Sequence, residues 1–166
     1  MASQEDDRRE FEEVIQKHFD FLSVAGFRAR GTRKIGTEGR DSGYVSRFES
    51  PDLRIKIGWS SFELSLIVTL KHTMSSLSDD QRYTYFEPLV QFLSEGGESA
   101  IVPYVTHRMS ARRLLRVMEE REAVFAQGLE PVAQKLAEKL NAHLTEVQSV
   151  SADQILRYHD WIGTIR

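Results

Sequence analysis

Apolar and polar residues alternate along the stretch from Leu53 to Leu70, and this pattern indicates how the chain folds. The apolar residues of the stretch are Leu53, Ile55, Ile57, Trp59, Phe62, Leu64, Leu66, Val68 and Leu70. Successive side chains of a β-strand point to opposite faces, so this set faces a core while the polar residues between them face water. We expect an antiparallel hairpin with a two-residue turn at Ser60-Ser61, in which Ile57 faces Leu64 and Ile55 faces Leu66. A slip by one residue would expose the whole apolar set, so burial should fix the register.

Helical periodicity and turn residues extend the pattern in both directions. Before the hairpin we expect a helix at about 4–25, ended by Gly26, a short polar strand over 27–35 and a strand at 43–49. The glycine-rich stretch Gly31–Gly43 is interpreted as a loop or a long hairpin connection. After the hairpin, a capping box at Ser78 and Gln81 predicts a helix that Pro88 kinks or restarts.

Three more helices are expected to close the chain. Ser110 caps the first, Pro131 lies in the first turn of the second, and Ser151 with Gln154 forms a capping box for the third. The segment from Ile101 to Val105 is β-branched but contains a proline, so it can be at most an edge strand.

The sequence therefore predicts an α+β fold in one domain, 1–166, with a helix and sheet over 1–75 and a helical part over 76–166. The sheet is expected to be an antiparallel meander of three or four strands, with an N-terminal helix before it and four C-terminal helices packed on one of its faces. A chain of 166 residues suits a single domain of this kind.

Composition narrows the chemistry. The chain has 40% hydrophobic and 28% charged residues, as is ordinary for a globular protein, and no apolar run near the ~20 residues of a membrane span. The absence of cysteine removes disulfides and thiolate chemistry and fits a reducing compartment, so we expect a cytoplasmic protein that does not contact a membrane. A net charge of −3 argues against nucleic-acid binding driven by bulk charge.

Short motifs that resemble catalytic or cofactor sites lack residues or geometry that the chemistry of such sites requires. The glycine spacing from Gly31 to Gly36 is that of a phosphate-binding loop, but no lysine follows the second glycine. Ser42 lies between glycines like a serine nucleophile, yet His159 and Asp160 are adjacent on one helix, point about 100° apart and cannot complete a triad. The five histidines show no metal-site spacing. We expect no catalytic residue, no metal and no cofactor, and therefore no enzyme.

The densest basic segment lies between residues 28 and 40 and is the first candidate binding surface. Its cations are Arg28, Arg30, Arg33, Lys34 and Arg40, opposed only by Glu38. Such a segment can steer an anionic partner, although a solvated loop is the plainer interpretation. Nucleic acid is disfavoured as the partner because no aromatic residue is interleaved to stack on bases, but contacts to phosphates remain open.

The C-terminal helices are the second candidate surface. Tyr158 and Trp161 would support docking there if they were exposed, because aromatic residues concentrate in interface hot spots. The arginines of the preceding helix, Arg112, Arg113, Arg116 and Arg121, alternate with glutamates and are interpreted as a solvated helix face.

In its layout the chain resembles small cytosolic bacterial proteins of the toxin-immunity kind. The resemblance covers about the first 75 residues: a helix ending at Ala25-Gly26-Phe27, then paired strands around Leu53–Leu70, with helices following. It includes no diagnostic motif, so no functional residue is carried over. It implies inhibition by occlusion, in which an exposed face covers the active site of a toxin.

Two functions are therefore expected, both non-catalytic. The first is a protein-binding or inhibitory protein of bacterial or phage origin, such as an immunity protein, acting through the solvent face of the sheet or the basic segment. The alternative is an accessory subunit of a larger bacterial defence or phage-encoded assembly, docked through its C-terminal helices. In both the partner is another protein, and homo-oligomerisation is left open.

Overall fold

The computed structural model describes residues 4–36, 43–106 and 108–165. Within these ranges one antiparallel sheet of five strands follows the chain in the order β1-β2-β3-β4-β5. The strands are β1 (Arg28–Ile35), β2 (Gly43–Glu49), β3 (Leu53–Ser60), β4 (Ser65–His72) and β5 (Tyr83–Tyr85). The helices are α1 (Gln4–Phe19), α2 (Phe21–Val24), the 3₁₀ turn η1 (Asp80–Arg82), α3 (Phe86–Leu93), α4 (Ala111–Val124), α5 (Leu129–Gln148) and α6 (Ala152–Ile162). The expected α+β class is confirmed, with one strand more than expected.

The central hairpin buries the face that we expect from the sequence, but its two strands pair in a different register. Ile55 pairs with Leu70, Ile57 with Val68 and Trp59 with Leu66, so a longer connection over 61–64 replaces the two-residue turn. The shift keeps the same residues on the buried side, because it moves the pairing by an even number of positions. Phe62, expected opposite Trp59, lies in this connection and is 58% exposed.

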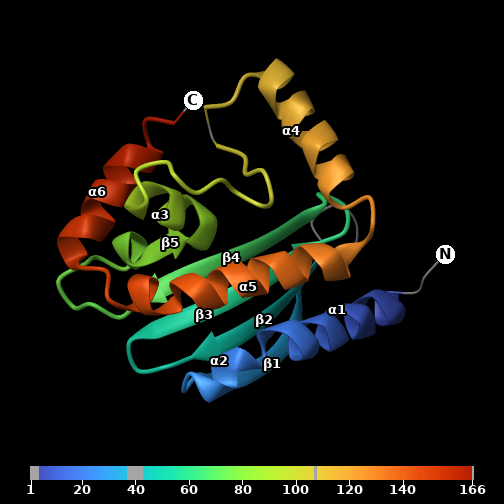
Figure 1. The fold of residues 1–166 in the computed structure, drawn as a ribbon, viewed down its shortest axis with the longest axis horizontal. Helices are drawn as coiled ribbons and strands as arrows, with labels where there is room; N and C mark the ends of the chain where they lie inside the picture. Colours follow the sequence, from blue (N-terminus) through green and yellow to red (C-terminus); the bar gives the residue numbers. More distant parts are fainter. Residues whose placement is uncertain (1–3, 37–42, 107, 166) are drawn as a thin grey trace.

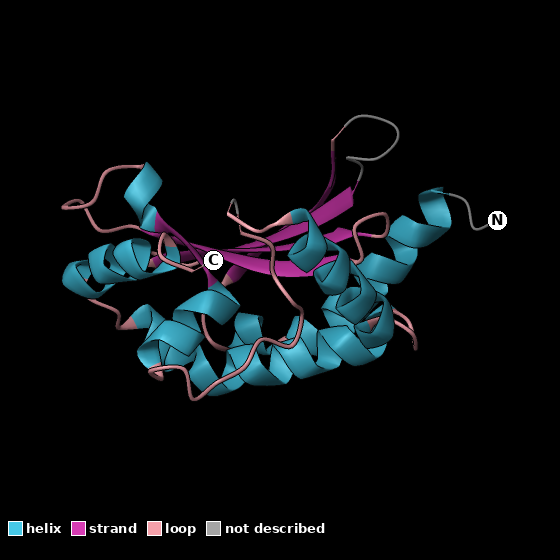
Figure 2. Ribbon diagram, turned by 90° about the horizontal axis from the view of Figure 1, so that it is seen from above, coloured by secondary structure: helices cyan, strands magenta, loops and turns pink. Residues whose placement is uncertain are grey.

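The helices cover one face of the sheet and bury its apolar residues. Figure 2 shows the sheet nearly edge-on with most of the helices on one side, and in Figure 1 α5 runs across the sheet beside α1. One hydrophobic cluster joins both parts of the chain, from Phe11 in α1 through Ile55 and Ile57 in β3 to Leu136 in α5 and Ile155 in α6. No described helix is both long and apolar enough to cross a membrane.

Two helix predictions need correction. The helix expected over 4–25 ends at Phe19, and the short α2 follows it before Gly26, which has φ +91° and stops it as expected. Ser78 and Gln81 do exchange capping hydrogen bonds, but a single 3₁₀ turn follows them instead of a helix. The next residues pair with β4 as β5, and the helix begins only at Phe86, with Pro88 in its first turn.

The segment from Ile101 to Val105 is not a strand. The buried carboxylate of Glu87 accepts hydrogen bonds from the main-chain N–H groups of Ile101, at 2.5 Å, and Val102, at 3.2 Å. The segment therefore satisfies its main chain on an α3 side chain instead of a sheet edge.

Candidate binding surfaces

The face of the sheet opposite the helices, here called the open face, collects basic residues from neighbouring strands. Side chains that alternate with the buried ones bring together Arg33, Arg47, Arg54, Lys56 and Lys71, and Glu49 is the acid among them. Alternation along each strand and pairing between strands place this set on one surface although it spans 39 sequence positions, from 33 to 71.

Ion pairs offset part of this charge. Arg30 Nε donates to Glu49 Oε2 at 2.8 Å, which lowers the pKa of the Glu49 carboxyl, and Lys71 Nζ donates to Asp79 Oδ1 at 2.9 Å. The Asp79 contact raises the pKa of Lys71, with a contribution from Tyr83. Among the described residues Arg33, Arg47, Arg54 and Lys56 make no ion pair within 4 Å, although Arg54 and Arg47 act on the Glu49 carboxylate at longer range. The open face therefore carries a net positive charge although the whole chain has a net charge of −3.

Tyrosines of β5 add an aromatic border to this face. Lys71 Nζ lies 4.7 Å and Lys56 Nζ 5.6 Å from the centre of the Tyr83 ring. Tyr85 is 53% exposed beside them. Tyrosine and arginine, unlike lysine, are enriched in protein interfaces.

A hollow of about 330 Å³ lies toward one end of the open face, where β3 ends and β4 begins. Gly58 lies between Val45 and Ile67 in the cross-strand row, so the row lacks one side chain. A Cβ on Gly58 would meet only the Ile67 carbonyl oxygen, at 3.9 Å, which is ordinary contact. The hollow is thus apolar at its floor and can be filled by substitution without strain.

The structure distributes the predicted basic segment over two surfaces. Residues 28–35 form the edge strand β1, which confirms the short polar strand predicted over 27–35 and shows that the loop predicted from Gly31 onward is wrong as far as Ile35. All side chains of β1 are exposed apart from the partly buried Thr32. Arg28, Arg30 and Arg33 join the open face. Lys34 pairs with Tyr44, whose side chain lies in the core, so it belongs to the helix side. Arg40 and Ser42 lie outside the described residues.

The aromatic residues predicted for the C-terminal surface are not free. Tyr158 is 1% exposed, and its hydroxyl accepts a hydrogen bond from the main-chain N–H of Tyr85 at 3.2 Å. Trp161 is half-buried against Phe92, with ring centres 5.5 Å apart. Tyr158 is therefore a core residue, and the exposure that would have supported its role in docking is absent.

Helix α4 differs from the other long helices because much of its apolar surface is uncovered. It stands out from the body of the fold in Figure 1. The helical spacing of its apolar residues predicts Leu114 and Leu115 on the inner side, but they are 39% and 67% exposed. Phe125, which follows the helix, anchors it by packing on Trp59 with ring centres 5.1 Å apart.

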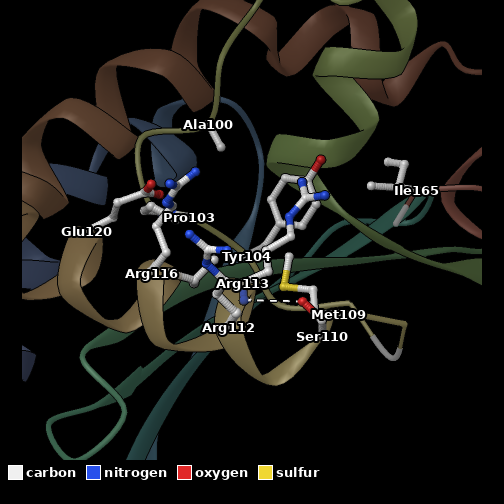
Figure 3. Close-up of a pocket in the computed structure, with 11 residues that line it drawn as sticks. Ala100, Pro103, Tyr104, Met109, Ser110, Arg112, Arg113, Arg116, Glu120 and Ile165 are labelled. Atoms are coloured by element: carbon white, nitrogen blue, oxygen red, sulfur yellow. Dashed lines mark hydrogen bonds between the residues drawn. The ribbon is translucent and has the colours of Figure 1, made fainter.

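A cleft of about 710 Å³, here called the α4 cleft, lies between this helix and the body. Its walls come from β4, the segment 102–106, α4 and the end of α6, and they are largely apolar. The cleft exists because β5 pairs only with Thr69, Leu70 and Lys71, so the start of β4 has no strand beside it. A second hollow, of about 540 Å³, lies along α4 and is bordered by Arg112, Arg113, Arg116 and Tyr104 (Figure 3).

Arg121 is the main correction to the expected solvated face of α4. It is 5% exposed, in line with the buried Val117 and Phe125 at spacings of four residues. Nε donates to the Pro103 carbonyl at 2.8 Å and Nη1 to the Glu63 carbonyl at 3.2 Å, so the side chain ties α4 to two loops. Burial lowers the pKa of the guanidinium, and the Glu63 charge opposes this.

The structure describes part of the motifs that resemble catalytic or cofactor sites. Gly31 to Ile35, most of the motif with phosphate-loop spacing, is part of strand β1. His159 Nε2 contacts the Gln81 carbonyl at 2.9 Å, and His18 Nε2 contacts Glu130 Oε1 at 3.2 Å. In the part of the chain that the structure describes, no group of three or more His, Asp or Glu side chains could hold a metal ion.

Comparison with known proteins found no match among family models, curated proteins or solved structures.

Proposed function

We propose that this chain is a non-catalytic protein-binding protein that recognises an acidic surface of its partner through the open face. The uncovered basic sheet face carries this proposal. A sheet packed on one side only leaves the other side for solvent or for a partner. Here that side combines a cluster of cations, a tyrosine border and an apolar hollow at Gly58.

The edge strand β1 extends the same surface. β1 pairs with β2 alone, so its other edge leaves main-chain groups for an extended segment of a partner. Its arginines and the irregularity between Ala29 and Thr32 also protect the edge against indiscriminate pairing. An acidic partner matches the charge of both the strand and the open face. Inhibition of a toxin by such a partner contact, as in immunity proteins, is one form of this function.

Charge reversal tests the proposal. Wild-type protein and the double variant Arg33→Glu/Arg54→Glu are used to isolate complexes from the source cells, and the recovered partner is then titrated in purified form. We expect a stoichiometric complex that weakens with salt and is lost in the variant. The control Arg9→Glu/Lys135→Glu reverses two exposed cations outside the open face, on α1 and α5, and should bind as wild type.

Filling the hollow is an independent test. Gly58→Leu removes the apolar recess without reversing a charge and should weaken the complex at all salt concentrations. A complex that both open-face variants leave intact contradicts the proposal. Binding that nuclease treatment abolishes would identify nucleic acid as the partner instead.

A second candidate is an accessory subunit that docks through its C-terminal helices. The observation in its favour is the exposed apolar surface of α4, with Leu115 67% exposed. Leu115→Glu should abolish the complex in this case, while Arg33→Glu/Arg54→Glu should leave it intact.

A further inference from the structure

We infer that the α4 cleft is a binding site for a small amphipathic anion, a molecule with an apolar body and a carboxylate or similar head. The cleft adjoins the open face, with which it shares Ile67 and Tyr85, but the inference does not depend on the proposed protein partner.

The size and lining of the cleft suit the apolar body. Its volume of about 710 Å³ is within the ~300–1,000 Å³ of small-molecule sites. Leu66 and Val68 of β4, Val102, Met118 and Ile162 supply apolar walls. Leu114 also lines the cleft and is 39% exposed, so apolar surface that the chain leaves in water would be covered by a ligand.

Arg121 supplies the charge that selects the head. Arg121 is 5% exposed as a residue, so its guanidinium loses part of its hydration, and a carboxylate normally compensates such a cost. Among the described residues Arg121 forms no ion pair, and its hydrogen bonds go to the carbonyls of Pro103 and Glu63. A guanidinium has five N–H donors, so donors remain for an anion in the cleft.

The acidic residues that line the cleft in the described part of the chain do not form an ion pair with Arg121. The Glu87 carboxylate is engaged by the N–H groups of Ile101 and Val102 and by Lys139 Nζ at 3.5 Å. Glu63 is exposed and acts on Arg121 only at longer range.

Two more polar residues of the wall are compatible with a ligand that carries a polar head. Arg108 lines the cleft as a second cation. The buried Oγ1 of Thr106, also in the wall, has no hydrogen-bond partner within the described ranges. Buried hydroxyls are normally satisfied, so this atom offers a further contact to a ligand.

The test compares three ten-carbon probes on the intact protein by isothermal titration calorimetry below the concentrations at which they form micelles. Decanoate should bind with one site per chain. Decanol should bind about tenfold or more weakly, the ratio expected for losing a charge-assisted hydrogen bond, and decyltrimethylammonium should not bind. Equal affinity for the three probes, or uptake of decanoate without a defined stoichiometry, would overturn the inference.

Two matched variants locate the site. Leu114→Trp fills the cleft and should lower the affinity for decanoate by about tenfold or more, which corresponds to a loss of roughly 1.4 kcal/mol or more of binding free energy. Leu115→Trp adds the same side chain to the part of α4 that faces solvent and should bind as wild type. Equal effects of the two variants would place binding elsewhere.

A third variant tests the charge. Arg121→Met should lower the affinity for decanoate to that for decanol while the affinity for decanol stays at its wild-type value, which separates loss of the charge from loosening of the α4 wall. If this variant does not fold, the head-group series on the wild-type protein still decides between an anion site and a merely apolar cleft.

Discussion

His72 lies on β4 with 2% of its surface exposed, and its Nε2 contacts Thr84 Oγ1 at 3.0 Å. Burial, with a smaller effect of His159, lowers its pKa from 6.5 to about 4. The imidazole is therefore neutral in the folded protein at pH values where the unfolded chain already takes up a proton. Since the unfolded state then binds more protons, stability falls as the pH decreases from about 6.5 to about 4.

This linkage gives the first prediction. The free energy of unfolding should decrease by about 2–3 kcal/mol across that window, at 1.36 kcal/mol for each unit of pKa difference. His72→Gln removes the titrating group and should flatten the dependence, as measured by urea unfolding at a series of pH values. Thr84→Val removes the hydroxyl but leaves His72 buried, so it should keep the wild-type slope. A His72→Gln profile parallel to wild type would show that other groups cause the loss.

Leu66 and Ile67 give a second prediction at this scale, because they are neighbours on opposite faces of β4. Leu66 is 1% exposed in the core, and Leu66→Ala should cost about 2–5 kcal/mol. Ile67 lines the hollow on the open face and is only partly buried, so Ile67→Ala should cost clearly less. Denaturant unfolding measures both, and equal costs would mean that the two faces are not differently buried.

At the scale of single elements, the N-terminus of α6 shows how much a local sequence signal can specify. Ser151 Oγ accepts from Gln154 N at 3.2 Å, and Gln154 Oε1 accepts from Ser151 N at 2.9 Å. Ser151→Ala should destabilise the protein by about 1 kcal/mol, and Ser151→Gly by only a few tenths. Thermal unfolding can resolve the difference, and equal effects would show that the cap does not contribute.

Helix α4 gives a prediction about attachment. Arg121 links it to the Pro103 and Glu63 carbonyls, and hydrogen bonds of charged groups contribute about 1.5–3 kcal/mol. Arg121→Met should therefore accelerate hydrogen exchange of α4 amides about tenfold or more while α5 amides keep their rates. Arg116→Met, at an exposed position of the same helix, is the control. Uniform acceleration throughout the protein would indicate global destabilisation instead.

The elements predicted from sequence are those whose signals are local. The cap at Ser151, the stop at Gly26 and the alternation in β3 each depend on residues close in the chain, and all are present in the structure. The capping box at Ser78 forms its hydrogen bonds but is followed by β5, because pairing with β4 outweighs the local preference for a helix. Strand pairing of this kind depends on residues distant in the chain, so a short stretch of sequence does not predict it.

The candidate surfaces show the same division. The basic residues Arg28, Arg30 and Arg33 could be found because they are clustered in the chain. The open face adds Arg54, Lys56 and Lys71, which only strand pairing brings beside them. Arg121 was missed because its charge suggested solvent, although its four-residue spacing from Val117 and Phe125 already placed it on their side of the helix.

For the molecule as a whole, the hydrophobic cluster that joins sheet and helices predicts cooperative unfolding. The chain has two tryptophans, Trp59 in β3 and Trp161 in α6, so each can report on one part. In Trp161→Phe the fluorescence comes from Trp59 in the sheet, and in Trp59→Phe it comes from Trp161 in the helical part. The far-UV circular dichroism of each variant gives the unfolding of its whole backbone for comparison. In each variant tryptophan fluorescence and far-UV signal should give the same urea midpoint. Separate midpoints within one variant would divide the molecule into two units.

α1 packs against α5, with Lys17 and His18 both contacting Glu130. During synthesis the apolar side of α1 leaves the ribosome before α5, a helix that ends only at Gln148. At ~5–20 residues per second this delay is on the order of ten seconds. Nascent chains therefore expose Phe11 and Phe19 to chaperones or to one another long before the native covering helix exists.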